Sequence, residues 1–273
     1  MSAAGPISGI DLDHVALAVE RWADAWPRYA VDLGGRWKSG GAGPGFAPSQ
    51  LAYANGMKVE LIAPNAVDRS DFLRRFLDRS GPGPHHLTFK VDDLAAALAA
   101  AEAAGHRPVG VDLTDPTWKE AFLHPKDAAI GVVVQLAQAE GSGWLTPAPP
   151  DFPATLGPQA SLSWVGHAVA SLAHGLAVFR DLLGGEESAS GEDEASRWIE
   201  LAWPGPGRVR LLEPASPAGP LAAWLGERPG RVHHVAFVCE DPASVLDATA
   251  LASGGYEVAP QHACGARLLL VRR

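Results

Sequence analysis

The sequence predicts an α+β fold made of two similar halves, each with several strands and a few helices. Three observations support it: short strand-like runs with alternating side chains, helix-like stretches between them, and a repeat of the same order of segments after a linker rich in Pro, Gly and Ser. At 273 residues the chain is long enough for two domains that each bury a core. We expect a first domain over 1–140, a linker over 141–161 and a shortened second domain over 162–273.

The first half contains two successive units with the same order, a strand, a helix and then further strands. In the first unit the expected strands are 12–19, 49–54 and 58–63, with a helix-like stretch at 21–33. The dipeptide Asn55-Gly56 predicts a tight hairpin between the last two strands.

A short helix at 70–80 leads to the second unit. Its Ala-rich segment after Asp93 predicts a helix with an aspartate cap. The strands expected around this helix are 85–91, 107–112, 119–123 and 131–137.

Four of the expected strands carry one polar residue suited to a metal. Successive side chains of a strand point to opposite faces, so the face of each residue can be read from its position. His14 shares its face with small alanines, and His86 shares its face with Thr88, whereas bulky residues occupy the other faces. Gln135 fits the same pattern, Glu60 fits it less well, and His85 falls on the bulky face beside Leu87.

Two imidazoles, one carboxylate and one amide oxygen form a donor set that suits a divalent cation and leaves positions open for water or substrate. A single buried histidine is more often a hydrogen-bonded core residue, and a single glutamate at a strand end is usually solvated. Four such residues at matched positions favour a metal site. We expect one divalent ion (Zn, Co, Ni, Mn or Fe) held by His14, Glu60, His86 and Gln135.

The second half repeats the series with most of these donors replaced. We match His167 to His14, Arg210 to Glu60, His234 to His86 and Leu269 to Gln135. A guanidinium cannot bind a cation as a ligand and leucine has no lone pair, so we expect the second domain to be metal-free. This half also lacks a segment corresponding to 112–129, so a strand and a loop are expected to be missing.

Composition excludes several classes of function. A net charge of −9 without a long Lys/Arg cluster argues against nucleic-acid binding. The N-terminus has no signal-peptide pattern and no apolar run could span a bilayer, so we expect a cytoplasmic protein without membrane contact. The two cysteines, Cys239 and Cys264, belong to different expected strands and give no disulfide framework.

The order of strands, the strand-to-helix junction HHLTFKVDD, and FLHPKD followed by GVVVQLAQ resemble the vicinal oxygen chelate superfamily. That group includes glyoxalase I, bleomycin-resistance proteins, extradiol dioxygenases and methylmalonyl-CoA epimerases, to which the local likeness is greatest. The resemblance covers 11–139 and, as a decayed copy, 162–273. It implies paired βαβββ modules in cupped mixed sheets around a divalent metal, with ligands at His14, Glu60, His86 and Gln135.

Gln135 departs from the family pattern. In family epimerases, glyoxalases and extradiol dioxygenases the last strand supplies a glutamate, and an amide cannot accept a proton from carbon at neutral pH. Some members place glutamine on the fourth strand and glutamate on the last, and this chain has the mirror arrangement. Among the four expected ligands Glu60 is therefore the one candidate base.

The resemblance implies Lewis-acid catalysis on a small substrate with two neighbouring oxygens. We expect an isomerase, epimerase or lyase in which Glu60 moves a proton, Lys90 supports an anionic group, and His124 and Lys126 close over the pocket. A lysine at a strand end is, however, more often a surface residue that reaches water.

Two alternatives remain open. His14, His86 and Glu60 have the composition of the two-His-one-carboxylate triad of non-haem Fe(II) dioxygenases. The second alternative is a protein that binds a drug or metabolite without a metal, as bleomycin-resistance proteins do. Family barrels often form across an interface, which makes a homodimer compatible with each of these functions.

Overall fold

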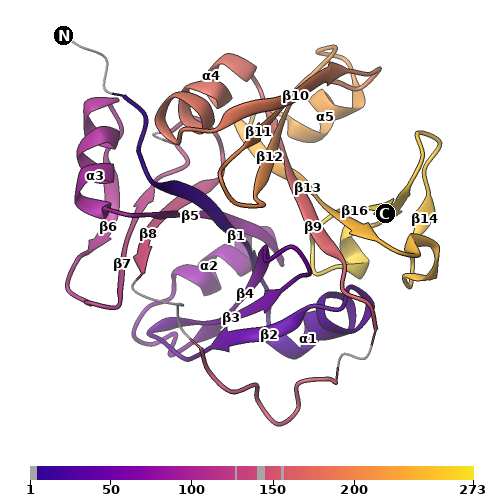
Figure 1. Cartoon of the computed structure of the whole chain (residues 1–273), viewed down its shortest axis with the longest axis horizontal. Coiled ribbons are helices and arrows are strands. Elements are labelled where there is room, and N and C mark those ends of the chain that lie inside the picture. Colours follow the sequence, from indigo (N-terminus) through magenta and orange to yellow (C-terminus); the bar gives the residue numbers. More distant parts are fainter. Residues whose placement is uncertain (1–4, 127, 140–144, 155–156) are drawn as a thin grey trace. The chain divides into compact units, whose positions relative to one another are not determined.

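The fold consists of two eight-stranded mixed sheets with few helices, which confirms the α+β prediction (Figure 1). The computed structural model describes residues 5–126, 128–139, 145–154 and 157–273. Sheet A has the strand order β2-β3-β4-β1-β5-β8-β7-β6, and sheet B has the order β10-β11-β12-β9-β13-β16-β15-β14. Each sheet draws its strands from one half of the chain. Parts of the expected linker, 141–144 and 155–156, lie outside the described residues.

The first module of sheet A consists of strands β1 to β4. It contains one strand that the sequence reasoning missed, β2. Its β3 and β4 pair antiparallel around Asn55-Gly56, where Gly56 has a φ of +88°, so the predicted hairpin is confirmed. β4 also pairs parallel with β1. The elements are β1 (Ile10–Ala18), α1 (Trp22–Trp26), a π-helical turn (Pro27–Asp32), β2 (Arg36–Gly40), β3 (Gly45–Ala52), β4 (Lys58–Asn65) and α2 (Phe72–Ser80).

The second module of sheet A follows the same order. The helix α3 forms where the Ala-rich run is expected, and the Asp93 carboxylate accepts a hydrogen bond from the Ala96 amide at 3.0 Å. Its buried side packs on β6, β7 and β8. The elements are β5 (Gly83–Val91), α3 (Leu94–Ala103), β6 (Pro108–Asp112), β7 (Trp118–Leu123) and β8 (Val133–Ala139).

In the first module, α2 covers one end of the sheet face that carries His14. The apolar residues Leu73 and Leu77 of α2 pack with Ala18 of β1 and Ile62 of β4. Ala18 lies four residues after His14 on β1, so both side chains are on the same face. A helix thus closes this face at one end and excludes water there.

Sheet B keeps eight strands, so the prediction that a strand is missing is wrong. The deletion instead shortens two strands, β14 and β15, and leaves a single 3-10 turn where sheet A has α3. The elements are β9 (Ser161–Val169), α4 (Leu172–Leu176), a π-helical turn (Ala177–Leu182), β10 (Glu186–Glu192), β11 (Ser196–Ala202), β12 (Arg208–Pro214), α5 (Pro220–Leu225), β13 (Gly230–Cys239), 3-10 turns (Pro242–Ser244 and Pro260–His262), β14 (Thr249–Ala250), β15 (Tyr256–Val258) and β16 (Leu268–Arg272).

The first modules of the two sheets match with a constant spacing. α1 and α4 begin at Trp22 and Leu172, which are 150 residues apart (172 − 22). The same spacing separates the starts of β2 and β10, and of β4 and β12. Arg210 is therefore the counterpart of Glu60, as predicted.

The same spacing shows that the match of His167 to His14 is wrong. The structural counterpart of His14 is Trp164, three residues earlier in β9. His167 pairs with Leu211, whereas Arg210 pairs with the residue before His167, so His167 and Arg210 lie on opposite faces of sheet B. Matching the two histidines by identity shifted the alignment and reversed the face.

Contacts between Cα atoms divide the chain into two compact units that each take one module from each sheet. Unit 1 comprises Met1–Asp13, His86–Gly141 and Trp164–His233, and unit 2 comprises His14–His85, Ser142–Ser163 and His234–Arg273. In unit 1 the backbones of Gly131 and Gly230 approach closely, since a Cβ on Gly131 would lie 1.9 Å from the Gly230 carbonyl oxygen. The division into domains 1–140 and 162–273 stays a prediction.

Within the part of the chain that the structure describes, no helix is long and apolar enough to cross a bilayer.

Candidate metal centre

Three of the four expected ligands form one group. The ligand atoms of His14, Glu60 and His86 lie within 4.8 Å of one another, and the residues are 0%, 8% and 6% exposed. They come from β1, β4 and β5, which are adjacent strands of sheet A. Ligand distances of about 2.0–2.2 Å from a metal separate neighbouring donor atoms by about 3–4 Å. The group is therefore close to the spacing that a shared ion requires.

The Glu60 carboxylate has a defined setting in the first module. Its Oε2 lies 3.5 Å from His14 Nε2, and its Oε1 accepts a hydrogen bond from Gln50 Nε2 at 3.2 Å. Gln50 lies directly opposite Glu60 on β3. A buried carboxylate needs such partners to offset the loss of hydration.

Gln135 lies on the same face of the sheet as His86. In the parallel pair of β5 and β8, Thr88 is opposite Gln135, and His86 precedes Thr88 by two residues. The Gln135 Oε1 accepts a hydrogen bond from Thr88 Oγ1 at 2.6 Å, and its Nε2 donates to Glu120 Oε2 at 2.7 Å. The amide is thus held from both sides.

Glu120 of β7 is a residue of this face that the sequence reasoning missed. Its Oε2 accepts a second hydrogen bond from Trp118 Nε1 at 2.9 Å. In the antiparallel pair of β7 and β8, Phe122 is opposite Gln135, so Glu120 and Gln135 share a face. No local pattern in the sequence singles Glu120 out, because its role depends on its partner Gln135 on the neighbouring strand.

Lys90 extends from β5 and is about one-third exposed. Its Nζ lies 3.3 Å from Asp13 Oδ1, so a protein carboxylate neutralises part of its charge. Support of a substrate anion by Lys90 stays a prediction.

His124 and Lys126 lie in an exposed turn after β7. The Lys126 amide donates to His124 Nδ1 at 3.3 Å, and the Ala128 amide donates to the His124 carbonyl oxygen at 3.0 Å. These bonds hold the turn to its own backbone. The closure of this turn over a substrate stays a prediction.

In sheet B a stacked arginine takes the place of the carboxylate. The Arg210 guanidinium lies 4.1 Å from the Trp164 ring and 4.3 Å from the Trp198 ring, and its Nη2 is 2.7 Å from Glu200 Oε2. Trp164 holds the position of His14. Indole and guanidinium groups offer no lone pair to a cation, so this arrangement supports the prediction of a metal-free second domain.

The second modules of the two sheets also correspond as expected. In β13 and β16, Ala236 is opposite Leu269, just as Thr88 is opposite Gln135 in β5 and β8. Ala236 follows His234 by two residues, as Thr88 follows His86. Leu269 therefore replaces the amide that sheet A offers at this position.

His167 serves the packing of unit 1 and is not a metal ligand candidate. Its Nε2 lies 2.8 Å from the Ile130 carbonyl oxygen, and its ring packs beside Phe179. Complete burial lowers the pKa of His167 to about 4, so the ring is neutral at pH 7 and its Nε2–H donates to Ile130. This bond attaches the segment before β8 to β9.

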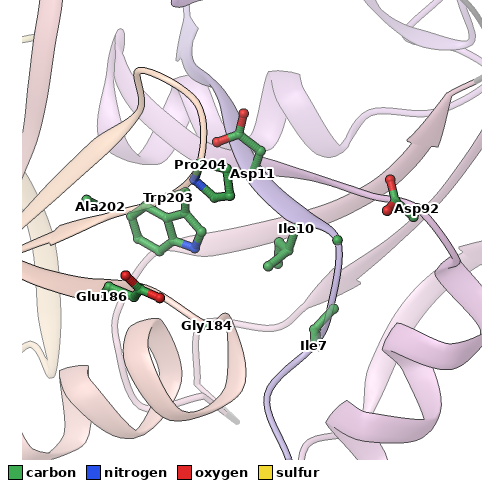
Figure 2. A pocket seen from close by; sticks show the side chains of 10 residues that line it. Ile7, Ile10, Asp11, Asp92, Gly184, Glu186, Ala202, Trp203 and Pro204 are labelled. Carbon is green, nitrogen blue, oxygen red and sulfur yellow. The ribbon is translucent and has the colours of Figure 1, made fainter.

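Unit 1 also contains a cleft of ≈490 Å³ that none of the expected metal ligands lines (Figure 2). The carboxylates of Asp11, Asp92 and Glu186 and the indole of Trp203 line this cleft. Burial raises the pKa of Asp11, which accepts a hydrogen bond from the Gly205 amide at 3.2 Å.

Comparison with protein families gives a match over residues 13–122 to the glyoxalase/bleomycin resistance protein/dioxygenase superfamily. The chain belongs to this superfamily. The matched range contains His14, Glu60 and His86, whereas Gln135 lies beyond it. A comparison with curated protein sequences found no significant match.

Solved structures with a similar fold include a mutant of 4-hydroxymandelate synthase from Streptomyces coelicolor. It has a TM-score of 0.62 and 19% identity, and the match covers 87% of this chain and 72% of that chain. At this identity the likeness extends to the fold alone. Methylmalonyl-CoA epimerase from Mycobacterium tuberculosis has 30% identity and a TM-score of 0.44, with 52% of this chain and 94% of that chain covered.

Proposed function

We propose that the chain is a metal-dependent isomerase, epimerase or lyase that acts on a small substrate with two neighbouring oxygens. The observation that carries this proposal is the buried group of His14, Glu60 and His86, whose ligand atoms lie within 4.8 Å of one another. Structural neighbours named as epimerases are compatible with this class of reaction.

The chemistry of the donor set fits a divalent transition metal. Imidazole nitrogens suit Zn, Co, Ni and Fe, and a single carboxylate leaves a bound divalent ion with net positive charge. Gln135 would add a neutral oxygen. When bound, a divalent ion acts as a Lewis acid toward the two substrate oxygens and stabilises negative charge that develops on them.

Glu60 is the group that we assign to proton transfer. It holds one oxygen toward His14 and the other toward Gln50, so its position is fixed before substrate enters. The neighbouring strand β1 presents the small side chain of Ala16 opposite Glu60. α2 excludes water from one end of this face and strengthens the electrostatic interactions there.

Metal titration of the purified chain tests this proposal. We expect one Zn²⁺ or Co²⁺ per chain, and a loss of affinity of about 100-fold or more in His14→Ala and His86→Ala, since loss of a direct ligand should cost at least as much as loss of its supporting residue. His174→Ala is the matched control, because His174 is exposed on α4, in the half of the chain that is expected to hold no metal. Absence of binding at micromolar Zn, Co, Ni and Fe would overturn the proposal and favour a metal-free binding protein.

A second candidate is a non-haem Fe(II) dioxygenase, favoured by the two-histidine-one-carboxylate composition of the same group. Oxygen consumption by the Fe(II)-loaded protein with catechol-like diols and keto acids separates the two functions. Uptake of oxygen that is lost in Glu60→Gln would select the dioxygenase. Proton exchange at a substrate carbon without oxygen uptake would select the isomerase or lyase.

A further inference from the structure

The side chains around Gln135 form a chain of hydrogen bonds across three strands of sheet A. Trp118 Nε1 and Gln135 Nε2 both donate to Glu120 Oε2, at 2.9 Å and 2.7 Å. On the other side, Thr88 Oγ1 donates to Gln135 Oε1 at 2.6 Å. β8 lies between β5 and β7, so the amide bridges the two neighbouring strands.

An amide has a donor end and an acceptor end, and rotation by 180° exchanges them. The Trp118 indole can only donate a hydrogen bond, so Glu120 Oε2 acts as its acceptor. The same carboxylate oxygen is an acceptor toward the Gln135 amide, and the end of the amide that faces it must be a donor. The Glu120 carboxylate therefore selects the orientation in which Gln135 turns its nitrogen toward β7. The carbonyl oxygen of Gln135 then faces β5, the strand that carries His86.

We infer that Glu120 is a positioning residue of the metal centre: it fixes Gln135 so that Oε1, the one atom of that amide able to bind a cation, is presented on the His86 side. This inference rests on the proposed metal binding. A carbonyl oxygen has two lone pairs, so Oε1 can accept from Thr88 and bind an ion at once. Residues that orient metal ligands in this way typically change affinity 10–100-fold.

The first module of sheet A contains the same pair with the two residue types exchanged. There the carboxylate of Glu60 is on the ligand strand β4 and the amide of Gln50 is on the neighbouring strand β3, with Nε2 and Oε1 3.2 Å apart. In the second module the amide of Gln135 is on the ligand strand and the carboxylate of Glu120 is on its neighbour. In each module, one side-chain oxygen available to a metal is thus held in place by a hydrogen bond between an amide and a carboxylate.

The arrangement of the first module, with the carboxylate on the ligand strand and the amide on its neighbour, can be reproduced in the second module by mutation. Glu120→Gln removes the fixed acceptor, so either end of the Gln135 amide can face β5, and we expect Zn²⁺ affinity to fall about 10–100-fold. In the double variant Glu120→Gln with Gln135→Glu, the new amide donates to the new carboxylate as Gln50 does to Glu60. We expect this variant to bind Zn²⁺ at least as tightly as the unmodified chain.

Isothermal titration with Zn²⁺ and the visible absorption of bound Co²⁺ measure these effects, with urea unfolding of each metal-free variant alongside. Glu20→Gln is the matched control, since Glu20 pairs with Arg74 on the surface. A packing role alone would lower the urea midpoint and leave the metal affinity of the folded protein and the Co²⁺ spectrum unchanged. That result would overturn the inference.

The outcomes also separate this inference from the proposed function. If the unmodified chain binds no metal, the proposed function fails. If it binds metal through His14 and His86 but Glu120→Gln binds equally well, the proposed function stands and the role of Glu120 is wrong. If Glu120→Gln does not fold, the comparison of the double variant with Gln135→Glu alone still decides. Both carry the same ligand at position 135, and the double variant alone has an amide at position 120 that can donate to it.

Discussion

His167 is a buried histidine whose protonation opposes folding. Its pKa falls from 6.5 to about 4 because burial removes water, and this effect outweighs the hydrogen bond to the Ile130 carbonyl, which raises the pKa. The folded state thus keeps the ring neutral, and the stability gained from this is present above pH 6.5 and lost as the pH falls toward 4. A shift of this size corresponds to about 3 kcal/mol of unfolding free energy.

We expect His167→Gln, which keeps a donor for Ile130, to lose less stability than the unmodified chain between pH 7 and pH 4.5. Urea unfolding of the metal-free proteins at both pH values measures the difference, which should be about 2–3 kcal/mol. Equal losses in the two proteins would show that His167 does not titrate as its burial requires.

The alternation of side chains along each strand is enough to locate most of the candidate site. The strand faces read from the sequence select His14 and His86, and the structure brings them together with Glu60. The faces alone could not show Glu120, because its role depends on a partner across the sheet, Gln135. His167 was matched to His14 because both are histidines. The constant spacing of the surrounding elements matches His14 to Trp164 instead.

At the scale of elements, α3 illustrates a helix whose start is set by one side chain. Asp93 has extended backbone geometry and its Oδ1 accepts from the Ala96 amide. We expect Asp93→Ala to lower the unfolding free energy by about 1 kcal/mol, and Asp93→Ser to lower it by less, since serine also caps helices well. Thermal unfolding followed by circular dichroism tests this, and equal stability of the alanine and serine variants would contradict it.

The sequence predicted regular elements better than irregular ones. The β3–β4 hairpin was predictable because Asn55-Gly56 favours positive φ. β2 was missed because its sequence RWKSG is largely polar and its pairing with β3 is interrupted by a bulge after Trp37, which breaks the alternation. The shortened β14 and β15 were missed because strands of two and three residues have no measurable period.

At the scale of the whole molecule, the compact units depend on close backbone approaches that have no local sequence signal. Gly131 has a φ of +68°, and a Cβ there would overlap the carbonyl oxygen of Gly230, which is distant in the sequence. The repeat predicted two sheets. It could not predict that each compact unit combines modules from both halves.

Gly131→Ala should therefore lower the unfolding free energy by about 2–5 kcal/mol, from backbone strain and steric overlap together. Gly105→Ala is the matched control, because Gly105 has a φ of +87° but no atom within 4 Å of the added Cβ. Its cost should be about 1–3 kcal/mol, from strain alone. Equal destabilisation of the two variants in urea would show that the contact between Gly131 and Gly230 is not formed.

The central claim is that one half of a duplicated chain holds a single divalent ion while the other half has replaced its ligands with Trp164, Arg210 and Leu269. Elemental analysis of the purified protein, combined with anomalous scattering from its crystals, tests this claim most directly. We predict one ion per chain, located at His14, Glu60 and His86. Two ions per chain, an ion bound in sheet B, or no ion after exposure to micromolar Zn, Co, Ni and Fe would contradict it.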